Sequence, residues 1–283
     1  MSEDRVVYMD NNATTQVAPQ VVAAMLPYFG EFYGNPSSMH TFGGKVQKAV
    51  DEAREKVANM LGARPDEVLF TSCGTESDNT AVWAALESYP YKKHVVTTRV
   101  EHPAVLNLGQ HLARHGYEVT FLPVDAKGHL DLDQVAESIR EDTAVVSIMW
   151  ANNETGVIFP VEEIAEMAKA KGAVFHTDAV QAAGKTPIDL ANNQIDMLAI
   201  RGHTLHAPKG VGVLYIRKGT RFVPHIMGGH QEKGRRAGTE NVPYIIGLGE
   251  ACQLALANME DENTRVRALR DRLEDGLLKI EAS

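Results

Sequence analysis

Residues 144–178 read AVVSIMWANNETGVIFPVEEIAEMAKAKGAVFHTD and place a helical pattern between two short apolar runs. The runs at 144–149 and 173–176 are rich in Val, Ile and Phe, which favour buried strands. Between them, residues 161–171 carry apolar side chains at helical spacing directly after a proline. This alternation predicts an α/β sheet flanked by helices.

The same alternation continues on both sides of this stretch, from about residue 67 to residue 216. We expect the other strands at 68–70, 94–98, 118–122, 197–200 and 211–216, and the other helices at 77–86, 105–115, 132–139, 244–259 and 262–280. Strands this apolar are typical of a sheet that is buried on both faces. No repeat or linker interrupts the region of the strands, so we expect one large domain there.

The composition narrows the class of protein. A chain of 283 residues with 44% hydrophobic composition can bury a substantial core, and no apolar run approaches the length of a membrane-spanning helix. The net charge of −9 argues against nucleic acid as a partner. The amino terminus lacks the pattern of a secretory signal, and two cysteines, Cys73 and Cys252, suit a reducing compartment, so we expect a cytoplasmic location. We expect no metal site.

Ligands gather where the strands of an α/β sheet end, so the turns after the strands form the candidate site. The turn TSCGTES at 71–77 opens a helix with small residues, whose free backbone N–H groups can hold a phosphate. An ordinary helix cap is the alternative interpretation. In the turn VEHP at 100–103, the imidazole of His102 can stack on a planar ring, or it is simply solvated.

Two further turns carry amides and carboxylates. WANNETG at 150–156 places them where a strand gives way to a loop, and FHTDAVQ at 175–181 puts Asp178 at the end of a strand and Gln181 about one helical turn later. A carboxylate beside a pyridine nitrogen keeps that nitrogen protonated, and an amide can donate to a phenolic oxygen on the same ring. A surface aspartate that caps a helix is the alternative.

Five segments together resemble cysteine desulfurases (NifS/IscS-like) of the class V aminotransferase family, which depend on pyridoxal 5'-phosphate (PLP). The segments are YMDNNATT at 8–15, GNPSS at 34–38, GTESDN at 74–79, NNETG at 152–156 and RRAGTEN at 235–241. The resemblance is closest to the nitrogen-fixation branch and runs in order from near residue 6 to the end of the sequence.

This resemblance implies the fold-type I PLP-dependent transferase large domain, a mixed seven-stranded sheet between helices, with most of the small C-terminal domain missing. We expect an N-terminal segment at 1–15, the PLP-binding large domain at 16–260 and the start of the truncated small domain at 261–283. Around the ring, the resemblance implies that His102 stacks on the pyridine and Asn153 lies near its oxygen side. Asp178 would pair with the ring nitrogen, and Gln181 would bond the phenolic oxygen.

Around the phosphate, the resemblance implies contacts from Gly74 and Thr75, with Gly202 and His203 at neighbouring cofactor-binding positions. Thr239 would reach the phosphate held by a neighbouring subunit. That role implies a homodimer with shared sites.

The sequence departs from the family after the strand at 197–200. Family members carry Ser-Gly-His-Lys or a close variant there, and the lysine forms a Schiff base with PLP, whereas this chain reads RGHT at 201–204. The hydroxyl of Thr204 can neither form an imine nor move a proton as a lysine amine does. Arg201 replaces a phosphate-binding serine but can still grip phosphate, which would leave PLP bound non-covalently. Lys209 is a weak candidate to replace the lost amine.

The activity implied by the resemblance is conversion of L-cysteine to L-alanine and an enzyme persulfide. The sulfur would pass to an iron–sulfur scaffold protein, for nitrogenase maturation in this branch. The family's acceptor cysteine lies beyond the end of this sequence, and neither Cys73 nor Cys252 matches it, so we expect weak or absent turnover. Two alternatives stay open. One is a non-catalytic relative that dimerises or binds a partner, and the other is a different PLP enzyme, such as a selenocysteine lyase or an aminotransferase.

Overall fold

The computed structural model describes residues 6–280 and contains one seven-stranded sheet. The strands are β1 (Val68–Thr71), β2 (His94–Thr98), β3 (Glu118–Leu122), β4 (Thr143–Ser147), β5 (Val174–Asp178), β6 (Met197–Arg201) and β7 (Gly212–Ile216). Each predicted strand is present, and the mixed seven-stranded sheet between helices is confirmed.

The direction of the strands decides where a site can form. Their order is β1-β7-β6-β5-β4-β2-β3, and β7 runs antiparallel to both of its neighbours. All other strands therefore run in one direction. Their carboxyl ends meet at one edge of the sheet, which is where open α/β sheets bind ligands.

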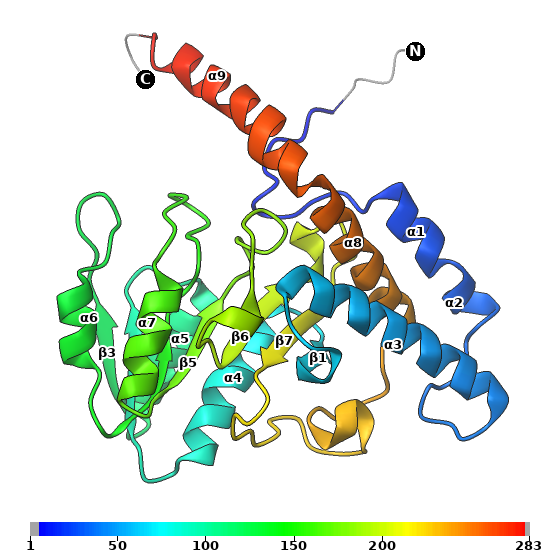
Figure 1. Cartoon of the computed structure of the whole chain (residues 1–283), viewed down its shortest axis with the longest axis horizontal. Helices are drawn as coiled ribbons and strands as arrows, with labels where there is room; N and C mark the ends of the chain where they lie inside the picture. The colour runs from blue at the N-terminus through cyan, green and yellow to red at the C-terminus, as the bar shows by residue number, and fades with distance from the viewer. Residues whose placement is uncertain (1–5, 281–283) are drawn as a thin grey trace.

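Helices cover both faces of the sheet (Figure 1). One face packs against α4 (Gly74–Ser88) and α5 (Pro103–Arg114), through side chains such as Leu86 and Leu112. The other face is covered mainly by α1 (Pro19–Met25), α3 (Thr41–Leu61), α6 (Leu132–Ser138), α7 (Val161–Ala170) and α8 (Val242–Asp261), while α2 (Pro27–Gly30) joins α1 to the segment before α3. The apolar strands are therefore buried from both sides, as their composition predicts.

The edge strand β3 departs from this expectation. Glu118 is exposed and the next three residues of β3 are only half-buried, because β3 pairs with a neighbour on one side alone. The expectation of burial on both faces is wrong for this strand. An edge strand tolerates such exposure, since half of its backbone groups already face solvent.

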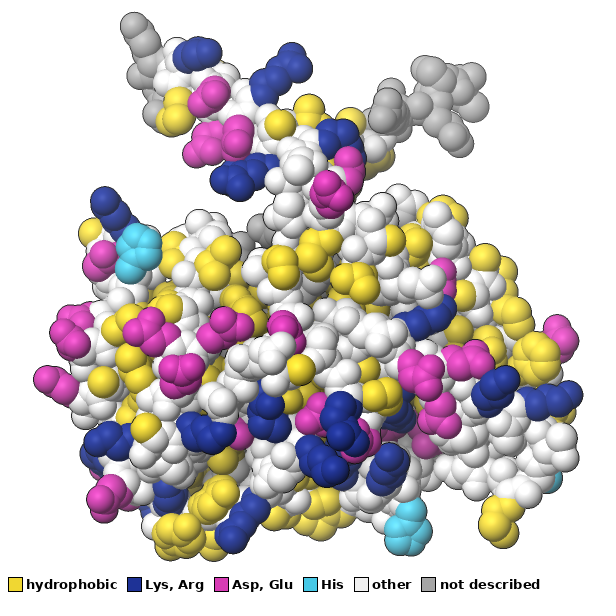
Figure 2. All heavy atoms as spheres, in the orientation of Figure 1, with side chains coloured by type: hydrophobic (Ala, Val, Ile, Leu, Met, Phe, Trp, Pro, Cys, Tyr) yellow, Lys and Arg dark blue, Asp and Glu magenta, His cyan; other side chains and the backbone are white. Residues whose placement is uncertain are grey.

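The chain leaves the body of the molecule after α8. After α8, the chain makes one π-helical turn over Glu262–Val266 and continues as α9 (Arg267–Leu277), which projects away from the sheet (Figure 1). Figure 2 shows side chains of both charge signs along this helix, and Leu269 and Leu273 are about half exposed. The division into segments 1–15, 16–260 and 261–283 stays a prediction. In the range 6–280, no helix combines the length and the apolar character needed to cross a bilayer.

A buried carboxyl group joins two strand ends beside the edge where the parallel strands finish. Glu101 is 5% exposed, and its oxygens accept hydrogen bonds from Thr98 Oγ1 at 2.8 Å and from the backbone N–H of Met149 at 3.1 Å. Burial raises the pKa of Glu101 from 4.5 to about 8, although these hydrogen bonds favour the charged form. The folded chain therefore binds this proton more tightly than the unfolded chain does.

We predict that the free energy of unfolding falls as the pH rises from about 4.5 towards about 8, because Glu101 must then lose its proton in a buried site. Each unit of difference between its folded and unfolded pKa corresponds to about 1.4 kcal/mol. Glu101→Gln should lessen this loss and make the chain more stable than wild type at the upper end of the range. Urea unfolding of both proteins across the range measures it, and parallel pH profiles would contradict it.

Candidate functional site

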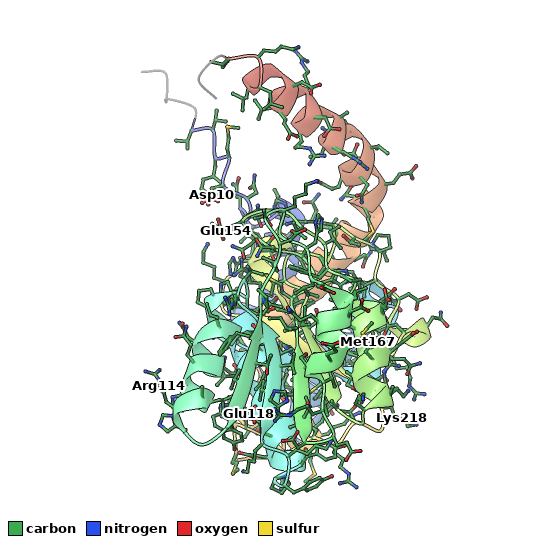
Figure 3. All side chains as sticks on the ribbon, turned by 90° about the vertical axis from the view of Figure 1, so that its left-hand side faces the viewer. Asp10, Arg114, Glu118, Glu154, Met167 and Lys218 are labelled. Atoms are coloured by element: carbon green, nitrogen blue, oxygen red, sulfur yellow. The ribbon has the colours of Figure 1, made fainter. Side chains whose placement is uncertain are left out.

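A cavity of about 650 Å³ opens at the carboxyl edge of the sheet. It is lined by Asp10, Asn12, Ala13, Cys73, Gly74, Thr75, Asp78, His102, Met149, Asn153, Glu154, Asp178, Val180, Gln181, Arg201 and His203. Figure 3 shows Asp10 and Glu154 at this end of the molecule, whereas Arg114 and Glu118 lie toward the opposite end. Most of the residues predicted from separate turns thus surround one cavity.

The turn after β1 supplies one wall. Helix α4 begins at Gly74, and Cys73 caps it by accepting a hydrogen bond from the backbone N–H of Glu76 on its sulfur, at 3.4 Å. The first backbone N–H groups of a helix have no partner within the helix and attract anions. Gly74 also permits close packing, since a Cβ there would lie 3.1 Å from a methyl group of Val180. The sulfur of Cys73 therefore caps the helix end that can bind an anion.

Two residues occupy the ends of β2 and β5. His102 caps α5, and its Nδ1 accepts a hydrogen bond from the backbone N–H of Ala104 at 3.1 Å. Asp178 is 5% exposed and accepts a hydrogen bond from the backbone N–H of Val180 at 2.9 Å. Burial raises the pKa of Asp178, and this hydrogen bond and the charges of His102 and Arg201 oppose that effect. Asp178 thus presents a carboxylate that a cationic ligand atom would stabilise.

The N-terminal segment closes part of the cavity, which the turn-by-turn reading of the sequence missed. The backbone carbonyl of Asn12 accepts hydrogen bonds from Gln181 Nε2 at 3.0 Å and from Arg201 Nη2 at 3.3 Å. Thr14 Oγ1 lies 3.2 Å from His203 Nδ1. These contacts span more than 160 positions in the chain, so only the resemblance of the segment at 8–15 hinted at them.

Asp78 is a second lining residue that the sequence reasoning missed. It follows Gly74 by four residues in α4, so both lie on the same face of the helix. Asp78 is 1% exposed, and its Oδ1 makes no hydrogen bond to any described residue. The spacing from the phosphate turn was the available signal, but an aspartate on a helix is usually solvated.

Three of the predicted site residues do not line the cavity. Gly202 is buried against Val211, where a Cβ would come within 2.8 Å of a methyl group. Thr204 is 5% exposed, and its hydroxyl lies 3.4 Å from the backbone carbonyl of Val180. Thr239 borders separate hollows beside Asn241. Within one chain, therefore, Thr239 does not border the cavity that most of the other candidate residues line.

A replacement for the family's Schiff-base amine would have to be a lysine side chain that reaches the cavity. Among the described residues, no lysine lines it. Lys209 is exposed on the turn before β7. Lys185 Nζ donates a hydrogen bond to Gln181 Oε1 at 2.9 Å and is the amine that reaches a cavity residue.

The residues present fit PLP. The amino end of α4 and the guanidinium of Arg201 suit a phosphate, and Asp178 suits a protonated ring nitrogen. A buried polar atom without a hydrogen-bond partner, Nε of Arg201, points to a polar occupant of the site. The volume is in the range of cofactor sites. Over residues 6–280, no group of three or more His, Cys, Asp or Glu side chains is arranged to hold a metal ion.

Comparison with known proteins agrees with this fit. The sequence pattern of the family described as "Aminotransferase class-V" matches residues 7–283. The chain is 61% identical to cysteine desulfurase NifS of Azotobacter vinelandii over 275 residues, which cover 97% of this chain and 68% of that protein.

Solved structures agree as well. A NifS-like protein superposes with a TM-score of 0.95 at 41% identity, covering 98% of this chain and 77% of the other. SspA in complex with cysteine superposes with a TM-score of 0.84 at 40% identity, covering 88% and 72%. The chain therefore belongs to the aminotransferase class-V family, in which it is similar to the NifS cysteine desulfurases.

Proposed function

We propose that this chain is a cysteine-desulfurase-like protein that binds PLP without a covalent link and turns L-cysteine over weakly or not at all. The observation that carries the proposal is that no amine is found in the cavity lining formed by residues 6–280. Thr204 stands where the family has its lysine, and no described lysine lines the cavity. The similarity to cysteine desulfurases supports the general function, and a solved relative, SspA, is described in complex with cysteine.

In this proposal, different residues of the cavity bind different parts of PLP. PLP, when bound, supplies an electron sink for bond cleavage at an amino acid. The amino end of α4 and Arg201 hold the phosphate, and His102 packs on the ring face. Asp178 keeps the ring nitrogen protonated, while Gln181 donates to the phenolic oxygen. Gln181 and Arg201 are both anchored to the carbonyl of Asn12, which orients them.

The remaining roles depend on parts outside the cavity of one chain. We propose a homodimer in which Thr239 completes the phosphate site of the partner, because Thr239 lies away from the cavity of its own chain. The sulfur acceptor of the reaction would be an iron–sulfur scaffold protein. Cys252 cannot serve as the acceptor thiol, since it is fully buried in α8 and burial raises its pKa to about 12.

The first prediction of the proposed function concerns the turnover of L-cysteine. With PLP and L-cysteine supplied, release of alanine and sulfide should stay near the level of a protein-free control, because no amine at the cavity can move the substrate proton. A complete cysteine desulfurase assayed beside it provides the reference. Turnover close to that reference would show that another group of this chain replaces the lysine.

The second prediction concerns the covalent link. Thr204→Lys should become yellow with PLP and retain the cofactor after borohydride reduction, which mass spectrometry detects as an added mass on that residue. Thr204→Ala is the matched control and should behave as wild type does. Labelling of wild type would contradict the proposal, and its loss in Lys185→Ala or Lys209→Ala would identify the amine responsible.

The third prediction concerns Arg201. Removing a charge-assisted hydrogen bond costs about 1.5–3 kcal/mol, so Arg201→Ala should weaken PLP binding about tenfold to a hundredfold. The variant should also lose most of the preference for PLP over pyridoxal, which lacks the phosphate. Arg201→Lys keeps the charge without the planar fork and should fall between the two. Fluorescence titration measures all three, and tighter binding by Arg201→Ala would show that the arginine crowds the site.

A further inference from the structure

Three carboxyl groups are buried around the cavity. Asp78 is 1% exposed, and Glu101 and Asp178 are each 5% exposed. Among the described residues that line the cavity, Arg201 is the one with a permanent positive charge. Glu101 keeps its proton up to a pKa of about 8, so the charge balance concerns Asp78 and Asp178. One guanidinium cannot balance two ionised aspartates in this buried place, and an unbalanced buried charge is costly, so a proton on one of the two is favoured.

Asp78 faces a buried imidazole in β5. Its Oδ1 lies 3.5 Å from Nε2 of His176, and neither atom makes a hydrogen bond to a described residue. The other ring nitrogen of His176, Nδ1, lies 2.9 Å from Oγ of Ser147. His176 is fully buried, and burial lowers its pKa to about 3, so the ring is neutral. A neutral imidazole carries one N–H and one bare nitrogen.

The two unpartnered atoms can satisfy each other in two ways. If Nδ1 of His176 donates to Ser147, the bare Nε2 needs a donor, and Asp78 can donate only when it is protonated. If Nε2 carries the hydrogen instead, Asp78 accepts it, either as an ionised carboxylate or through the carbonyl oxygen of its protonated form. With an ionised Asp78, this second arrangement places a negative charge near Asp178 and Glu101, whereas the first places none there.

The groups that face Asp78 decide between these arrangements. Burial raises its pKa well above the usual value, and the neighbouring carboxyl group of Asp178 adds to this effect. Arg201 opposes it but also faces Asp178. His176 cannot help, because it stays neutral. The protonated form of Asp78 is therefore favoured. Burial raises the pKa of Asp178 as well, but Asp178 accepts a backbone hydrogen bond and faces His102 and Arg201, and these three favour its ionised form.

We propose that Asp78 is a positioning residue that keeps a proton between its carboxyl group and Nε2 of His176, which leaves Asp178 as the ionised carboxylate of the cavity. The line Ser147, His176, Asp78 then holds one proton at a fixed place behind the site. The consequence for the reaction rests on the proposed function, because an ionised Asp178 is what a protonated ring nitrogen requires. The proton on Asp78 is a property of the chain alone.

The test therefore starts with the protein free of PLP. The NMR chemical shifts of the His176 ring nitrogens, assigned by their loss in His176→Gln, report which nitrogen carries the hydrogen. We expect Nδ1 to carry it and Nε2 to accept a hydrogen bond in wild type. Asp78→Asn should keep this state, since its amide can donate to Nε2, whereas Asp78→Ala should lose the hydrogen bond to Nε2. A hydrogen on Nε2 in wild type would overturn the proposal.

A pH profile gives a second readout that a purely structural role would not change. Between the unfolded and folded pKa of Asp78, the free energy of unfolding should fall as the pH rises, because the folded chain holds the proton more tightly. Measured in the Glu101→Gln background, Asp78→Asn should remove most of this fall. An unchanged profile would overturn the proposal, and if the double variant does not fold, the wild-type NMR result decides. A separate PLP titration tests the proposed function, and failure to bind PLP would leave the result for Asp78 standing.

Discussion

Burial of both faces of a sheet whose strands run mostly in one direction is the constraint on which this structure depends. Apolar strands such as β4 and β5 are covered by helices from both sides, so a site that a ligand can reach forms only where the strands end. Because every strand but β7 points the same way, those ends meet at one edge. The cavity with Gly74, His102 and Asp178 is a consequence of this geometry.

The charge balance of the cavity distinguishes this chain from what its resemblance implies. A site for PLP in this family is expected to contain a lysine amine, and here Thr204 has none while Arg201 brings a guanidinium. Arg201 donates a hydrogen bond to the carbonyl of Asn12 and interacts electrostatically with the buried carboxyls Asp78 and Asp178. Arg201 thus brings a permanent positive charge to the cavity, which suits anion binding better than it suits proton transfer.

The N-terminal segment ties distant parts of the chain together at this edge. Thr15 donates its backbone N–H to the carbonyl of His203 at 2.9 Å, and its hydroxyl accepts from the backbone N–H of His206 at the same distance. His206 takes a left-handed conformation there. Together with the contacts of Asn12, these bonds hold the turn after β6 in place. The position of Arg201 therefore depends on residues that precede the first strand.

The sequence by itself determined the succession of strands and helices, because buried strands and amphipathic helices leave different periodic patterns in the local chain. It also marked the turns that carry Gly74, His102, Asp178 and Gln181, since small or polar residues directly after an apolar run stand out. Only the tertiary structure decided which of these turns share one cavity, that Asn12 and Asp78 join them, and that Thr204 and Thr239 do not line it. The reason is physical. Strand order, strand direction and the burial of a single polar atom arise from contacts between residues far apart in the chain, and no local pattern records them.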